Sequence, residues 1–237
     1  MGIDEGEPAS ENNLICPVRS GAPASSGALE VPRNELKKPI WLLGHSLPAK
    51  WVDELKEPLY PRFPTRHSIW TPIWDYMQER VWSCGGRGRI DRSKLFVSNV
   101  AEKQKHGENA DINWKSEAFQ HRLKNYRSSL NQHRPPVLIT FGADAYRFAA
   151  AGLCAKGKPP RKLRAVELGE RFCEAVGDWK TDGTNVFPLL HVWAALRWDQ
   201  AGKAYCGDAG GNYFEFVGYK LADLFLTHAP RLPIWSE

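Results

Sequence analysis

Cysteine is scarce in this chain and forms no recognisable pattern. The five cysteines are odd in number, widely spaced, and include no Cys-x-x-Cys pair. A disulfide framework and a zinc or iron–sulfur site are therefore not expected. This use of cysteine is typical of a reducing compartment, and we expect a cytoplasmic protein without a metal or other cofactor.

Long apolar runs and internal repeats are also missing. No stretch approaches the roughly 18 apolar residues that a membrane-spanning helix needs. The acidic residues 1–11 contain no apolar segment of the kind found in signal peptides. We therefore expect a soluble protein with no membrane partner.

The composition that is present favours one packed domain. Of the 237 residues, 42% are hydrophobic and 25% are charged, which is typical of a globular core. Residues 1–33 are rich in Gly, Pro, Ser and Ala and are predicted to be a disordered tail, with a single domain over 34–237. Lys and Arg number 32 against 27 acidic residues, and the net charge of +5 modestly favours a polyanionic partner.

Apolar runs alternate with segments of helical periodicity along the domain. Four short runs predict buried strands at residues 39–44, 95–100, 137–142 and 186–191. Helices are predicted at residues 48–55, 70–82, 114–133, 143–153 and 213–227, and loops at 84–92 and 103–113. Such alternation indicates an α/β fold, a three-layer α/β/α sandwich with a central four-stranded parallel sheet.

Polar residues with useful chemistry stand where three of these strands end. In parallel sheets, ligands bind beyond the carboxyl ends of the strands. His45, Asn99 and His191 are each placed there. An imidazole can donate a hydrogen bond to a developing oxyanion or act as an acid–base group, and a carboxamide can read the edge of a pyrimidine. The alternatives are a histidine satisfied by backbone carbonyls and an asparagine in a turn or helix cap.

Two flanking loops add candidate residues. After His191 come Trp193, Leu196 and Arg197, which could form an apolar wedge with a phosphate-binding arginine or could simply dock onto the core. The loop after the first strand reads Gly-His-Ser-Leu-Pro over residues 44–48 and is similar to a nucleophile elbow with Ser46 as nucleophile, although a proline replaces its second glycine. An anion- or base-binding loop at a helix N-terminus is the other interpretation.

Taken in order, these segments resemble the uracil-DNA glycosylase superfamily. The strand at 95–100 resembles the family's strand ending in an Asn that reads uracil, and residues 134–145 are similar to its strand and Gly-x-Ala turn. The segment 186–197 looks like the family's last motif, a strand ending in His followed by a loop of apolar residues and Arg. Residues 210–224 match its closing turn and helix. The resemblance covers residues 38–228.

This resemblance implies hydrolysis of the N-glycosidic bond of uracil or a related damaged base in DNA. His191 would donate to O2 of the leaving base, and Asn99 would read its edge. Gly44, Ser46 and an aromatic floor, Phe63 or Trp70, would line the pocket. Gly142 and Ala143 would donate backbone N–H groups to a DNA phosphate, and Trp193, Leu196 and Arg197 would open the duplex. We expect a monomer that needs no cofactor.

The chain departs from that family's pattern at two places. The family's first loop carries an acidic or amide residue that positions water, whereas here no carboxylate follows the first strand until Asp53. Val192 and Trp193 replace the Pro and Ser that follow the last-motif histidine. Three interpretations stay open: a divergent glycosylase using His45 or Asn99 to position water, an inactive glycosylase-fold protein that binds nucleic acid or a nucleobase, and a serine hydrolase using Ser46.

Overall fold

The computed structural model describes residues 38–45, 70–86, 88–91, 94–101, 112–154, 159–191, 194–195, 205, 212–228, 232 and 234–236. The expected tail at 1–33, the expected helix at 48–55 and nearly all of the expected loop at 103–113 lie outside these residues.

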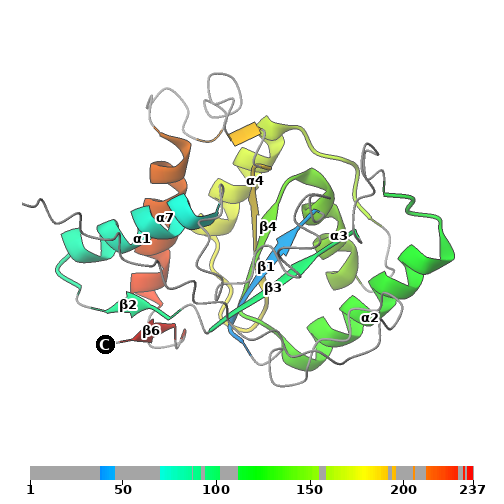
Figure 1. Cartoon of the computed structure of the whole chain (residues 1–237), viewed down its shortest axis with the longest axis horizontal. Helices are drawn as coiled ribbons and strands as arrows, with labels where there is room; N and C mark the ends of the chain where they lie inside the picture. The colour runs from blue at the N-terminus through cyan, green and yellow to red at the C-terminus, as the bar shows by residue number, and fades with distance from the viewer. Residues whose placement is uncertain are drawn as a thin grey trace, which may run out of the picture.

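The centre of the domain is a four-stranded sheet in which all strands are parallel, in the order β3-β1-β4-β5 (Figure 1). Its strands are β1 (Ile40–Gly44), β3 (Leu95–Asn99), β4 (Val137–Phe141) and β5 (Asn185–Leu189). The C-terminal residues of neighbouring strands lie side by side, with Gly44 opposite Asn99 and Phe141 opposite Leu189. The predicted strands and their parallel arrangement are thus confirmed.

Helices cover both faces of this sheet. They are α1 (Trp70–Ser83), α2 (Glu117–His133), α3 (Ala143–Leu153), α4 (Ala165–Gly177) and α7 (Tyr213–Thr227). Figure 1 shows α1 and α7 on one side of the strands and α2 and α3 on the other. Helix α4 packs beside β5 and contacts α7. The predicted three-layer α/β/α sandwich is therefore confirmed.

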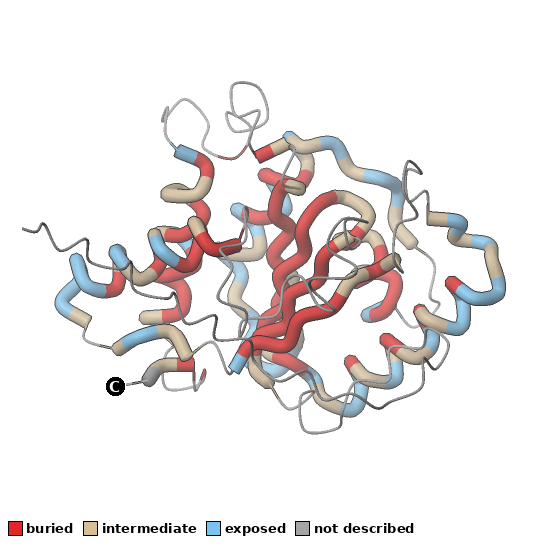
Figure 2. The backbone as a smooth tube through the Cα atoms, in the orientation of Figure 1, coloured by how far each residue is buried: buried red, intermediate tan, exposed pale blue. Residues whose placement is uncertain are grey.

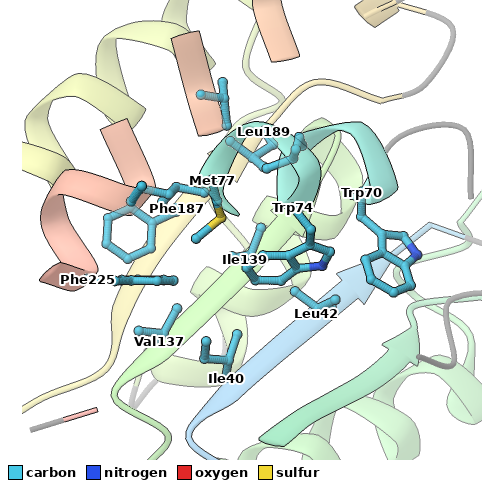
Figure 3. Close-up of a cluster of buried hydrophobic side chains, with 14 of the residues drawn as sticks. Ile40, Leu42, Trp70, Trp74, Met77, Val137, Ile139, Phe187, Leu189 and Phe225 are labelled. Carbon is cyan, nitrogen blue, oxygen red and sulfur yellow. The ribbon is translucent and has the colours of Figure 1, made fainter. Parts of the chain in front are cut away.

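The strands divide the core into two hydrophobic clusters because successive side chains point to opposite faces. On β1, Ile40 and Leu42 join the cluster under α1 and α7, whereas Trp41 and Leu43 join the cluster under α2 and α3. Figure 2 shows the strands buried along their length, and Figure 3 shows the first cluster closing over β1 and β4. A sheet buried on both faces leaves its strand ends as the places where polar side chains can gather.

Two parts of the fold differ from the sequence-based expectation. The segment 84–92, expected to be a loop, contains β2 (Arg89–Ile90), which pairs antiparallel with β6 (Trp235–Ser236). A strand of two residues is too short to show a periodic pattern, so the sequence could not predict this pairing between distant segments. Helix α4 was not predicted either, although it is amphipathic and buries Leu168 and Phe172, one turn apart, in the first cluster.

Among the described residues, no helix combines the length and apolar character needed to cross a membrane.

Candidate functional site at the carboxyl edge of the sheet

The strand order creates a topological switch point between β1 and β4. From β1 the chain continues to β3 on one side, and from β4 it continues to β5 on the other. The segments that leave β1 and β4 therefore diverge at the carboxyl edge, which is where open α/β sheets bind ligands. His45 follows β1 directly, and Gly142, Ala143 and Asp144 follow β4.

Gly142 is in close contact with His191. Its φ of +97° lies in the region that L side chains rarely adopt, and a Cβ placed on it would meet the His191 Cβ at 3.2 Å. The Gly142 N–H donates to the carbonyl of Leu189 at 2.8 Å, continuing the β4–β5 pairing beyond the strands. This hydrogen bond corrects the expectation that the Gly142 N–H binds a DNA phosphate, because that N–H already pairs with β5. A phosphate at the α3 N-terminus would bind the N–H groups of Ala143 and the residues after it.

Two buried tyrosines, which the sequence reasoning missed, hold the end of β5. The Leu190 N–H donates to the Tyr213 hydroxyl at 2.8 Å, and the Tyr205 hydroxyl donates to the Pro188 carbonyl at 2.9 Å. Tyr213 is the first residue of α7, so this helix determines where the segment carrying His191 leaves the sheet. The only sequence signal for this role is the Asn-Tyr pair that opens the helix.

His45 and His191 come together above the sheet. Their ring centroids are 6.3 Å apart and the ring planes are nearly perpendicular, at 88°. The His45 backbone is fixed because its carbonyl accepts the Ala101 N–H at 2.8 Å. The two histidines follow β1 and β5 and are far apart in the sequence, yet they share one site.

Asp144 is the carboxylate of this site, and the sequence reasoning missed it. Its Oδ2 lies 4.0 Å from the His45 Nε2 and 2.9 Å from the Lys162 Nζ, and its Oδ1 lies 3.5 Å from the Arg147 Nη1. The available signal was an acidic residue in the first turn of a helix, where the helix dipole favours negative charge. In the sequence no carboxylate follows β1 until Asp53, and α3 brings Asp144 to His45.

The environment of His191 keeps its imidazole neutral. Burial lowers its pKa below the usual 6.5, the nearby His45 lowers it further, and Asp144 partly opposes both effects. A neutral imidazole offers one N–H donor and one acceptor nitrogen. His191 can therefore stabilise a developing anion by hydrogen bonding through this N–H without first becoming positively charged.

This pKa shift predicts a pH-dependent stability. Between the depressed folded pKa and about 6.5, the unfolded chain binds a proton at residue 191 more readily than the folded chain does. The contribution of His191 to the free energy of unfolding is therefore fully present above about pH 6.5 and is lost as pH falls through the folded pKa. The free energy of unfolding, measured with urea, is expected to fall from pH 7.5 to pH 5 by less in His191→Gln than in the wild type. An equal fall in both proteins would contradict the shift.

Asn99 lies on the opposite edge of the sheet from His191. Two strands, β1 and β4, separate β3 from β5. Three inter-strand spacings of ~4.8 Å put the backbones roughly 14 Å apart. The two side chains can therefore bracket a ligand that spans β1 and β4, but they are too far apart to act on each other directly.

Of the remaining expected site residues, the structure describes only Trp70 and Gly44. Trp70, the alternative aromatic floor, is 4% exposed and packs edge-on against Trp74 within the hydrophobic cluster (Figure 3), so its ring belongs to the core. Gly44 sits at the end of β1, between Asn99 and the α3 turn. Ser46, Phe63, Trp193, Leu196 and Arg197 lie outside the described residues.

The described cations near the α3 N-terminus are engaged within the chain. Lys162 pairs with Asp144, and Arg161 and Arg164 both pair with Glu167. Glu167 accepts hydrogen bonds from Arg161 and from the Arg164 backbone, and these hold its pKa at about 2. A phosphate backbone tracking this segment would have to compete with these pairs.

No family model matches the sequence, and no curated protein matches it. Within the part of the chain that the structure describes, no group of three or more His, Cys, Asp or Glu side chains has a metal-binding arrangement.

Proposed function

We propose that this protein is a DNA N-glycosylase that hydrolyses the bond between deoxyribose and uracil or a related damaged base. The observation that carries the proposal is the paired placement of His191 and His45 at the switch point, with Gly142 packed against His191. The resemblance in the order of the sequence motifs gives the substrate class.

The chemistry of base release suits this arrangement. The glycosidic bond breaks through an oxocarbenium-like sugar, and the base departs with the electron pair as an anion. A neutral imidazole N–H directed at the anionic oxygen stabilises that charge in the transition state. The lowered pKa of His191 supplies the neutral donor, and Asn99, at the end of β3, would read the opposite edge of the base.

A glycosylase fold that binds a nucleobase or nucleic acid without turnover is the second candidate. It is favoured by the absence of a carboxylate in the loop directly after β1. It predicts binding that weakens steeply with salt and that survives the loss of His191, because phosphate contacts would supply the affinity.

An oligonucleotide assay tests the proposal. The purified full chain is incubated with end-labelled substrates carrying uracil in single-stranded DNA, in U·A and U·G pairs, or hypoxanthine, and alkali-labile abasic sites are scored. We expect strand breaks after alkali with at least one substrate and none with a matched thymine control. Absence of breaks with every substrate would overturn the proposal, and salt-sensitive binding without breaks would favour the second candidate.

A further inference from the structure

We propose that Asp144 is a positioning residue that orients His45 and stabilises its protonated form, so that His45 can accept the proton of the water attacking the sugar. The inference rests on the proposed glycosylase reaction for its chemical step. Its geometric part, a carboxylate acting on an imidazole, stands on the contacts of the site alone.

The geometry selects one tautomer of His45. Its Nε2 is the nitrogen that faces Asp144, with 4.0 Å to Oδ2. A proton on Nε2 is attracted to the carboxylate, which makes Nδ1 the basic nitrogen of the neutral ring. The 4.0 Å separation exceeds a direct hydrogen bond, and such catalytic contacts commonly tighten when the substrate binds. A base oriented by a third group is the general pattern by which imidazoles are prepared for proton transfer.

The Asp144 carboxylate is itself held in place from two directions. Lys162 approaches Oδ2 from the segment before α4, and Arg147 approaches Oδ1 from the next turn of α3. The Arg147 guanidinium is anchored because its Nε donates to the Pro160 carbonyl at 2.8 Å, and it lies 4.4 Å from the centre of the Trp114 ring. Both cations pair with the carboxylate, and the anchored arginine limits its movement.

Among the described residues, two titratable groups face His45 from different elements. Asp144 comes from α3, and His191 comes from the segment after β5. Lys162 and Arg147 are each paired with Asp144. Because the pKa of His191 is lowered, Asp144 is the charged member of these two groups.

The proton and electron balance of the step is complete with water as the only co-reactant. The C1′–N bond breaks and its electron pair leaves with the base, whose anion accepts the His191 hydrogen bond. The water oxygen bonds to C1′, and one water proton passes to Nδ1 of His45, where Asp144 stabilises the imidazolium. The imidazolium then releases this proton, by way of solvent, to the departing base. The products are the neutral base and an abasic sugar.

The test compares Asp144→Asn with Glu167→Gln. Glu167 is a matched control because it too is a mostly buried first-turn carboxylate paired with two cations, but it lies on α4 and away from the histidines. In Asp144→Asn we expect kcat to fall about tenfold, KM to stay unchanged and the acid limb of the pH–rate profile to move to lower pH. Glu167→Gln is expected to leave rate and profile unchanged, and Asp144→Glu to restore the profile in part.

A second readout does not depend on activity. In ¹⁵N-resolved NMR of the full chain, the His45 ring is expected to show the Nε2–H tautomer, and its titration to move to lower pH in Asp144→Asn but not in Glu167→Gln. An unmoved His45 titration would overturn the inference, and so would an unmoved acid limb in an active enzyme. If no substrate is cleaved but the His45 titration moves as expected, the proposed function fails while the Asp144–His45 coupling is established.

Discussion

The variant His191→Ala is expected to lose about 10²–10³-fold in the rate of base release, with DNA binding largely retained. Removing one preorganised donor from a developing oxyanion costs this much in enzymes that depend on such a donor. The loss should appear in kcat and not in KM, because the donor acts on charge that exists only in the transition state. Single-turnover cleavage of the best substrate of the oligonucleotide panel measures it.

The exposed His121 on α2 provides the control, since its ring contacts only Asn125 among the described neighbours and lies outside the site. His121→Ala should match the wild type in rate and in thermal unfolding. A correctly folded His191→Ala variant that cleaves as fast as the wild type would remove residue 191 from the chemistry.

The second large effect is expected from Gly142→Ala, compared with Gly85→Ala. Both glycines have positive φ, +97° and +78°, so an added methyl group strains the backbone of each variant. A left-handed residue costs about 1–2 kcal/mol, and Gly142→Ala costs more, because the ψ of 166° at Gly142 belongs to a region that is essentially confined to glycine. Only at Gly142 would the new Cβ press against His191, at 3.2 Å; around Gly85 nothing lies within 4 Å. Because a displacement of about 1 Å at a reacting group can cost 10²-fold, Gly142→Ala should lose up to about 10²-fold in rate and Gly85→Ala none.

Chemical denaturation and single-turnover kinetics on the same samples separate the two contributions. A larger stability loss in Gly142→Ala than in Gly85→Ala, with an activity loss confined to Gly142→Ala, is the expected result. Equal activities in the two variants would show that the close contact between residue 142 and His191 has no role in placing the imidazole.

The local sequence pattern was sufficient to predict the strands of the sheet and most of the helices that cover it. The runs around Leu42, Val97 and Ile139 are mostly apolar, which is typical of strands buried on both faces. The helices α3 and α7 begin and end where the periodicity predicts. These features depend on residues within a few positions of each other, so they can be read along the chain.

The sequence alone determined which strands end in chemically useful residues, and so it identified His45, Asn99 and His191. Only the tertiary structure decided which of them meet. The order β3-β1-β4-β5 brings His45 toward His191 and leaves Asn99 on the far edge, and it adds Asp144 from a helix that local patterns read as structural. The reason is physical: strand order and side-chain distances depend on contacts between segments far apart in the chain, and no local periodicity encodes them.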